Sequence, residues 1–342
     1  MRVGIVGASG YSGGELLRYL LAHPLFEVDY IAAGSNAGNS ITSLHPNLSS
    51  LHGKKFEATT LDRCNQVELL FLALPHGESA SLVRDVNTEV KIVDLGADFR
   101  LGSKESWQRY YGGEHAGTWV YGLPEIPGNR QKISATTRIA NPGCYATTIA
   151  IGTAPFVANG SIEAGDITVV AASGTTGAGR NAKINLLGSE VMGSLSSYKF
   201  GGVHQHTPEI EETLQGVARD VKQKVRISFT PILAPMPRGI LATITARTTT
   251  SNVDELKHEF LEYFKEEPFI HLLEDSMPQT SSVVGSNHVH VAIAHDVHTS
   301  RMVLSVAIDN LGKGAAGQAI QNANLLAGFD ETLGLMAAGL GK

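Results

Sequence analysis

The sequence is organised around the stretch Ala140-Asn141-Pro142-Gly143-Cys144-Tyr145-Ala146-Thr147. Asn-Pro is a turn signal, and the glycine that follows lets the backbone bend tightly. An uncharged run rich in Ala, Thr and Ile continues to Val157, which predicts a buried helix that begins at the cysteine. Because a helix N-terminus offers unpaired N–H groups and the positive end of the dipole, we expect a stabilised thiolate at Cys144. The alternative is a small, buried apolar residue.

Length and composition predict a globular chain of two domains. The 342 residues are 42% apolar and 18% charged, with a formal net charge of −6, which favours neither nucleic acid nor a membrane surface as a partner. Two cysteines make no disulfide framework, and no Cys/His spacing is typical of a metal site. The chain starts directly in a strand pattern and has no apolar run of membrane-spanning length, so we expect a cytoplasmic protein.

The N-terminus has the pattern of a dinucleotide-binding turn. A β-branched run at 2–6 is followed by a glycine-rich turn and by helical periodicity at 14–21, an order in which backbone N–H groups approach a pyrophosphate. The glycine spacing differs from G-x-G-x-x-G, and a plain strand–helix turn is the alternative. The residues expected to contact the cofactor are Gly7, Ser9, Gly10, Tyr11, Ser12 and Gly13.

The end of the second expected strand, Glu27–Ala32, bears on the choice of cofactor. NAD enzymes place Asp or Glu there to hold the ribose 2′-hydroxyl. This chain has no acid there, and Ser35 and Asn36 can hydrogen-bond a 2′-phosphate, although no arginine lies nearby in the sequence. The pattern favours NADP, and an uninformative polar loop is the alternative.

Strands at 68–74 and 90–95, with a helix at 78–86 between them, continue a doubly wound parallel sheet. Ligands bind beyond the carboxyl ends of such strands. There Arg100 is expected to clamp a phosphate or carboxylate, unless it forms a salt bridge with Asp98 or another neighbour. Three histidines in polar loops are interpreted as surface residues: His45, His52 and His115.

After the cysteine helix, a strand at 166–172 leads into a glycine-rich loop at 173–180. Such a loop is expected to bring the backbone close to a ligand, and the alternative is a flexible crossover. Thr207-Pro208-Glu209 has the pattern of a helix start, which by itself explains Glu209. His206 then lies just outside the helix, where the dipole favours a neutral imidazole that can act as a base. On an extended segment His204 and His206 point to opposite sides, which argues against a metal site.

The remaining pattern predicts an α+β domain on a mixed or antiparallel sheet. Arg238 is a second candidate anion clamp, and a small-residue helix at 315–326 is expected to pack back against the first domain. The expected strands are 225–233, 239–248, 289–295 and 302–309, with a helix at 252–264.

Several motifs together resemble the N-acetyl-γ-glutamyl-phosphate reductases of arginine biosynthesis. The resemblance covers nearly the whole chain and is carried by the glycine turn, Asn141-Pro142-Gly143-Cys144-Tyr145, Ser173-Gly174, His204-x-His206-x-Pro208-Glu209, Pro235-Met236-x-Arg238-Gly239 and Asp309-Asn310-Leu311-x-Lys313-Gly314-Ala315-Ala316-Gly317-Gln318-Ala319. It implies an α/β chain with an NADP-binding Rossmann domain, 1–143 plus 310–342. A catalytic and oligomerisation domain, 144–309, is inserted in it.

The resemblance also implies roles for single residues. Cys144 is the nucleophile and His206 the acid/base, oriented by Glu209. Tyr198 lies near the active site, and the residues near the nicotinamide are Ser173, Gly174 and Asn310. Members are homo-oligomers, dimers or tetramers. Two positions depart from the family: Gln205 replaces an arginine, and residues 34–36 lack a basic residue beside the 2′-phosphate.

The implied chemistry is NADPH-dependent reduction of an acyl phosphate through a cysteine thioester to an aldehyde. Aspartate-semialdehyde dehydrogenase and a carrier-linked aminoadipate phosphate reductase share this logic. A non-catalytic NADP-sensing or scaffold protein on the same fold is the alternative from another class. The sequence leaves the oligomer size and the exact acyl chain open.

Overall fold

The first sheet consists of short, strongly apolar strands whose residues are mostly buried. The computed structural model describes residues 1–341, and six parallel strands have the order β2-β1-β3-β4-β6-β5. This arrangement confirms the predicted parallel sheet. The strands are β1 (Arg2–Val6), β2 (Glu27–Ala32), β3 (Leu69–Leu72), β4 (Lys91–Asp94), β5 (Val120–Tyr121) and β6 (Arg138–Ala140).

The glycine turn joins β1 to α1 (Tyr11–Ala22), which begins three residues earlier than its apolar periodicity predicted. Gly7 has a φ of +85°, and a Cβ there would lie 2.3 Å from the carbonyl oxygen of Ala73. No larger residue fits such a close approach of two backbone segments. Gly10 is the N-cap and contributes no side-chain cap, so the first N–H groups of α1 are free for a ligand.

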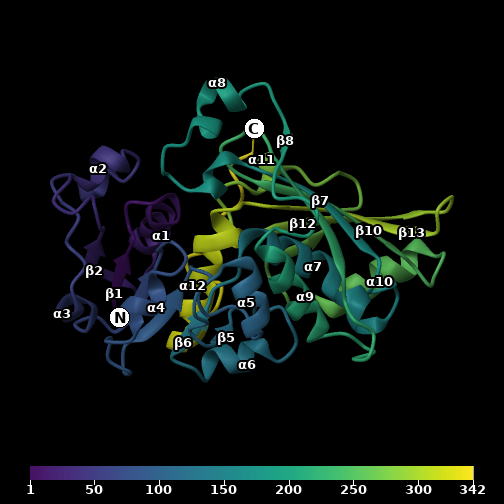
Figure 1. Cartoon of the computed structure of the whole chain (residues 1–342), viewed down its shortest axis with the longest axis horizontal. Helices are drawn as coiled ribbons and strands as arrows, with labels where there is room; N and C mark the ends of the chain where they lie inside the picture. The colour runs from purple at the N-terminus through teal and green to yellow at the C-terminus, as the bar shows by residue number, and fades with distance from the viewer. Residues whose placement is uncertain (342) are drawn as a thin grey trace.

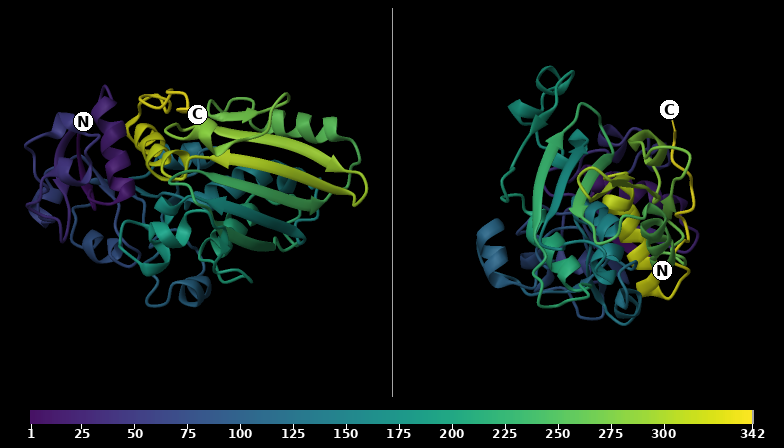
Figure 2. Two further views of the ribbon diagram at one scale, coloured as in Figure 1. Left: turned by 90° about the horizontal axis from the view of Figure 1, so that it is seen from above. Right: turned by 90° about the vertical axis from the view of Figure 1, so that its right-hand side faces the viewer.

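The second sheet is mixed, as predicted, and has seven strands in the order β11-β12-β13-β10-β7-β9-β8. Alternate residues of its strands are buried, because α7 (Cys144–Asn159) and α10 (Val253–Tyr263) pack on one face (Figure 2). The strands are β7 (Ile167–Ser173), β8 (Ser196–Ser197), β9 (Ile227–Leu233), β10 (Ile240–Arg247), β11 (Ile270–Leu272), β12 (Val289–Asp296) and β13 (Arg301–Ile308).

Two elements join the sheets. The helix α7 follows β6 after three residues and begins at Cys144, as predicted. After β13 the chain forms a π-helical turn, η4 (Gly312–Ala316), which continues into α12 (Gly317–Ala327). The helix α12 packs against α1, α6 (Asn129–Ser134) and β4, and Figure 1 shows it in yellow between the two sheets. The domain limits at 143/144 and 309/310 stay predictions.

The remaining elements are short, apart from α9. No helix among residues 1–341 has the length and hydrophobicity that a membrane span needs. These elements are α2 (Ile41–Leu44), η1 (Ser49–Leu51), α3 (Leu61–Cys64), α4 (Ser79–Val83), α5 (Lys104–Tyr110), η2 (Thr175–Ala178), η3 (Ile184–Leu186), α8 (Gly188–Val191), α9 (His206–Gln215) and α11 (Thr280–Val283).

Candidate active site

A cavity of about 1280 Å³ extends from the glycine turn to Cys144. Its walls come from the ends of β1 and β3, from the start of α7 and from the segment that follows β7. This is the place where open α/β sheets bind ligands. One cavity therefore holds both the expected cofactor turn and the expected nucleophile.

All of the predicted cofactor residues of the first domain line this cavity: Gly7, Ser9, Gly10, Tyr11, Ser12, Gly13, Ser35 and Asn36. Asn36 Nδ2 donates to Ser9 Oγ at 3.2 Å, which ties the end of β2 to the glycine turn. A Cβ on Gly13 would lie 2.6 Å from the Ala8 Cα, so the turn stays tight. With free N–H groups and no acidic side chain in the first turn of α1, this end fits the pyrophosphate of a dinucleotide.

Cys144 is the first residue of α7 and lines the opposite end of the cavity. Burial raises the pKa of its thiol to about 11, although the backbone N–H of Tyr145 and the Arg100 guanidinium both act to lower it. The effect of the helix N-terminus is present, but desolvation of the charged sulfur outweighs it. The expectation of a stabilised thiolate is therefore wrong for the free protein, in which the thiol is neutral and needs a base.

His206 supplies an imidazole beside this thiol. It lines the same cavity, and its Nε2 lies 2.5 Å from the point where a Cβ on Gly143 would stand. Its Nδ1 is buried without a hydrogen-bond partner. Burial, followed by the charge of Arg100, lowers the pKa of His206 well below the usual value. The ring is therefore neutral at physiological pH, as predicted, but burial rather than the helix dipole is the main cause.

Two details of the histidine segment correct the sequence-based predictions. The helix α9 begins at His206 and not after Thr207, because the Nδ1 of His204 accepts the backbone N–H of His206 at 3.1 Å. The rings of His204 and His206 do not point to opposite sides. Their centroids lie 5.0 Å apart, in an edge-to-face arrangement.

Glu209 lies one turn into α9 and is 2% exposed. Its Oε1 accepts the backbone N–H of Gly143 at 2.7 Å and the hydroxyl of Tyr121 at 2.9 Å, while its Oε2 lies 3.4 Å from Arg100 Nη1. No hydrogen bond joins it to His206 among the described residues. Glu209 therefore contacts the turn before the nucleophile and the buried arginine directly, and the orientation of His206 by Glu209, which the resemblance implied, stays a prediction.

The two candidate anion clamps have different surroundings. Arg100 lines the cavity near Cys144, and it pairs with Glu209 instead of Asp98. Its Nε and Nη2 donate to the carbonyls of Asn141 and Leu95 at 2.8 and 2.7 Å, which fixes the plane of the guanidinium. Arg100 is thus held rigidly at the reacting end of the cavity.

Arg238, by contrast, is not brought to the lining of the cavity. All three of its nitrogens donate to the carboxylates of Glu15 and Asp309. These bonds link α1 to the end of β13. The structure favours a structural ion pair for Arg238 over the predicted anion clamp.

The other residues that the resemblance implied surround the site. Asn310 lines the cavity and accepts the backbone N–H of Gly239 at 2.7 Å. A Cβ on Gly174 would lie 2.7 Å from the backbone oxygen of Pro237 and from the backbone nitrogen of Arg238, so only glycine fits there. Ser173 precedes it at the end of β7. The Tyr198 hydroxyl donates to the hydroxyl of Tyr145, the residue after the nucleophile, at 3.1 Å. Neither tyrosine lines the cavity.

Sequence reasoning missed four residues in or beside the site. His76, in the loop between β3 and α4, lines the cavity, and burial lowers its pKa to about 4. Gly314 in η4 supports the nucleophile, since a Cβ there would lie 2.8 Å from the Cys144 Cβ. His45, expected on the surface, is 4% exposed, and its Nε2 lies 2.9 Å from the carbonyl oxygen of Ala8. Arg180, distant in the sequence, lines the cavity with Ser35 and Asn36.

Comparison with known proteins places these features in a family. Residues 2–136 match the family model described as semialdehyde dehydrogenase, NAD binding domain, and residues 144–310 match the one described as semialdehyde dehydrogenase, dimerisation domain. Proteins of Acidothermus cellulolyticus and Frankia casuarinae, both named N-acetyl-gamma-glutamyl-phosphate reductase, are 51% and 50% identical over 99% of this chain and 98% of theirs.

Solved structures of similar fold are far less similar in sequence. An aspartate semialdehyde dehydrogenase II from Vibrio cholerae has a TM-score of 0.71 and 18% identity over 95% of this chain and 98% of its own. The Candida albicans aspartate semialdehyde dehydrogenase, solved with NADP, has a TM-score of 0.71 and 16% identity over the same shares. These similarities support the fold.

Proposed function

Because the chain belongs to the N-acetyl-gamma-glutamyl-phosphate reductases, a family of oxidoreductases within the semialdehyde dehydrogenases, we propose that it reduces N-acetyl-glutamyl 5-phosphate to N-acetyl-glutamate 5-semialdehyde and phosphate. The observation that carries this proposal is the meeting of Cys144, His206 and Arg100 in the cavity that also contains the glycine turn. That combination offers a nucleophile, a neutral base and an anion-binding group beside a dinucleotide site.

The first step is attack by Cys144 on the acyl phosphate. Since burial keeps the thiol protonated, His206 accepts its proton as the sulfur–carbon bond forms. The carbon–oxygen bond to the phosphate then breaks, and its electron pair leaves with the phosphate. The product is a thioester on Cys144. The backbone N–H groups at the start of α7 are available to stabilise the oxyanion of the tetrahedral intermediate.

The second half of the reaction returns the cysteine to its thiol. A nicotinamide cofactor supplies the hydride that reduces the thioester carbon to the aldehyde level. His206 holds a proton for the substrate oxygen and takes it back when the carbon–sulfur bond breaks. Arg100 fits the phosphate or the substrate carboxylate, since its guanidinium lies rigidly in the wall of the cavity.

The cofactor in this proposal is NADP, used as NADPH in the biosynthetic direction. The glycine turn would hold the pyrophosphate, and Ser35 and Asn36 would approach the adenosine ribose, where no carboxylate stands to repel a 2′-phosphate. Ser173, Gly174 and Asn310 would lie toward the nicotinamide.

The assembly and location in this proposal follow from the family. We assign the chain to a homo-oligomer, a dimer or tetramer, because residues 144–310 match a dimerisation domain. The substrate and cofactor are small, water-soluble metabolites, which favours the cytoplasm as the place of the reaction.

One assay tests the proposed reaction. Phosphate-dependent NADP reduction is measured with N-acetyl-glutamate semialdehyde, aspartate semialdehyde and a longer homologue side by side. We expect the acetylated five-carbon substrate to have the highest kcat/KM. A higher kcat/KM with aspartate semialdehyde or the longer homologue would reassign the substrate, and no turnover with any of them would contradict an enzymatic role.

A further inference from the structure

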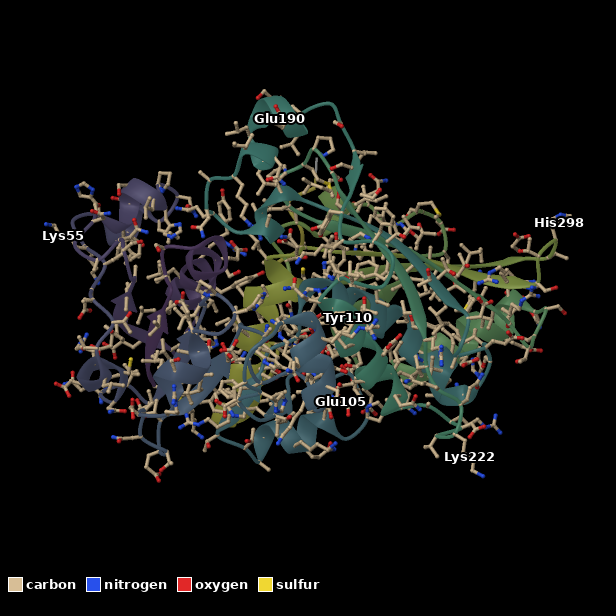
Figure 3. The ribbon with its side chains drawn as sticks, viewed as in Figure 1. Lys55, Glu105, Tyr110, Glu190, Lys222 and His298 are labelled. Carbon is tan, nitrogen blue, oxygen red and sulfur yellow. The ribbon has the colours of Figure 1, made fainter. Side chains whose placement is uncertain are left out.

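The segment that follows β7, residues 174–187, crosses from the second sheet to the first domain, and we call it the crossing segment. Figure 1 shows it in teal as it reaches toward α1 and α2, before the chain turns outward to α8. Glu190 of α8 marks the outer end of this excursion in Figure 3. Residues 176–183 of the crossing segment line the cavity opposite the glycine turn.

Arg180 anchors the crossing segment to the first domain. Its Nη1 donates to the Leu44 carbonyl at 3.0 Å, and its Cζ lies 4.7 Å above the ring of Tyr11, the first residue of α1. Its Nη2 lies 3.4 Å from Nδ1 of His45. Since the Ala8 carbonyl near the other ring nitrogen can only accept, the neutral His45 carries its hydrogen on Nε2 and accepts from Arg180 through Nδ1. Burial lowers the pKa of His45 and favours this neutral form.

Within the described part of the chain, the charge of Arg180 has no counterpart. No carboxylate lies within salt-bridge distance of it among residues 1–341, and its Nε is buried without a partner. By contrast, Arg238, which links the domains, is neutralised by the carboxylates of Glu15 and Asp309, and Arg100 has the carboxylate of Glu209 3.4 Å from its Nη1. A half-buried guanidinium that contacts only neutral groups and faces a cavity is suited to an anionic ligand.

The position of Arg180 indicates which anion. Dinucleotide-binding folds recognise the ribose either with an acid at the end of the second strand, for a 2′-hydroxyl, or with a nearby arginine, for a 2′-phosphate. This chain has no acid after β2 and no arginine near it in the sequence. The fold nevertheless places Arg180 in the wall of the same cavity as Ser35 and Asn36, the residues that follow β2.

We propose that Arg180, contributed by the catalytic domain, binds the 2′-phosphate of the cofactor and is the main determinant of selectivity for NADP. The inference rests on the proposed function, in which the cofactor is NADP. Its consequence is that the cofactor bridges two domains: the glycine turn holds one phosphate group and the crossing segment holds another. Loss of Arg180 therefore weakens binding of the phosphorylated cofactor selectively.

The test is calorimetric binding of 2′,5′-ADP and of 5′-ADP, which lacks the 2′-phosphate, to the full chain. Arg180→Leu is compared with Arg180→Lys, which keeps the charge, and with Arg226→Leu, a control at an exposed position outside the cavity lining. We expect Arg180→Leu to raise the Kd of 2′,5′-ADP by about 10- to 100-fold, the range for losing charge-assisted hydrogen bonds. The Kd of 5′-ADP should change by less than about threefold, and Arg180→Lys should fall between parent and Arg180→Leu.

Other outcomes overturn the inference in distinguishable ways. An equal rise in the Kd of both nucleotides for Arg180→Leu would place Arg180 at a group other than the 2′-phosphate. Unchanged Kd values in an Arg180→Leu variant that keeps the parental Tm would show that Arg180 binds neither nucleotide. If the parent itself does not prefer 2′,5′-ADP, the proposed NADP cofactor fails together with the inference. If the parent prefers 2′,5′-ADP and Arg180→Leu keeps that preference, only the inference fails.

Discussion

Replacing Gly143 by alanine tests the placement of His206 and leaves the side chains of Cys144 and His206 chemically unchanged. A Cβ at Gly143 would stand 2.5 Å from His206 Nε2 and 2.9 Å from Arg100 Nη1, whereas ordinary contact begins at 3.4 Å. The imidazole must therefore retreat by about 1 Å, and a misplacement of that size costs about 10²-fold in rate. Gly143 has a φ of −71°, which alanine adopts freely, so the backbone itself is not strained by the change.

The assay is steady-state kinetics of phosphate-dependent NADP reduction, with NADPH binding and Tm measured on the same preparations. We expect Gly143→Ala to bind NADPH like the parent and to lose about 10²-fold in kcat/KM. Gly165→Ala is the matched control, because Gly165 is exposed and a Cβ there would meet only Lys224 O, at 3.7 Å. Parental kcat/KM in a folded Gly143→Ala variant would show that His206 does not act from its observed position.

Three further predictions follow from buried charges and from the cavity. Lys313→Met should lower the free energy of unfolding, measured in urea, by about 3–5 kcal/mol, because the buried carboxylate of Glu125, which lies 2.5 Å from the Lys313 ammonium, would lose its partner. Adding Glu125→Leu should recover most of this loss, and a loss below about 1 kcal/mol in Lys313→Met would contradict a stabilising buried pair. Because burial raises the pKa of Cys144 to about 11, only a small fraction of its thiol is ionised at neutral pH. The rate at which iodoacetamide alkylates Cys144, followed by peptide mass spectrometry, should therefore rise about tenfold per pH unit from pH 7 to 10, and a plateau below pH 8 would show a lower pKa. Ser35→Asp should shift the ratio of kcat/KM values toward NAD, since a carboxylate repels the 2′-phosphate and accepts from a 2′-hydroxyl; an unchanged ratio would remove Ser35 from the cofactor site.

Local sequence patterns predicted the features that local physics determines. The alternation of apolar runs and glycine turns predicted the parallel sheet, and the uncharged run after Gly143 predicted that a helix begins at Cys144. The short strands β5 and β6 were missed, because runs of two and three residues carry no periodicity, and only pairing with β4 and with each other makes them strands.

The connections within the site depend on tertiary contacts that no local pattern contains. Thr207-Pro208 has the composition of a helix start, yet the ring of His204 accepts the first N–H instead, and the Thr207 hydroxyl is buried without a partner. Asp98 lies two residues before Arg100 in the sequence, but it accepts the backbone N–H groups of Gly77 and Ala80, and Arg100 pairs with Glu209 instead.

Electrostatics and long-range approach account for the remaining differences. The thiolate prediction weighed the helix N-terminus but had no measure of burial, which dominates the pKa of Cys144. No basic residue follows β2 closely in the sequence, and Arg180, more than a hundred residues further on, reaches the cavity that Ser35 and Asn36 line.

The central claim is that Cys144 carries the acyl group during the reaction, and trapping that group tests it most directly. The protein is mixed with the acyl phosphate in the absence of NADPH, quenched in acid and digested, and its peptides are weighed by mass spectrometry. We expect the mass of the N-acetyl-glutamyl group on the Cys144 peptide, released phosphate in equal amount, and neither in Cys144→Ser. Acylation at Cys64 instead, or full turnover by Cys144→Ser, would contradict it.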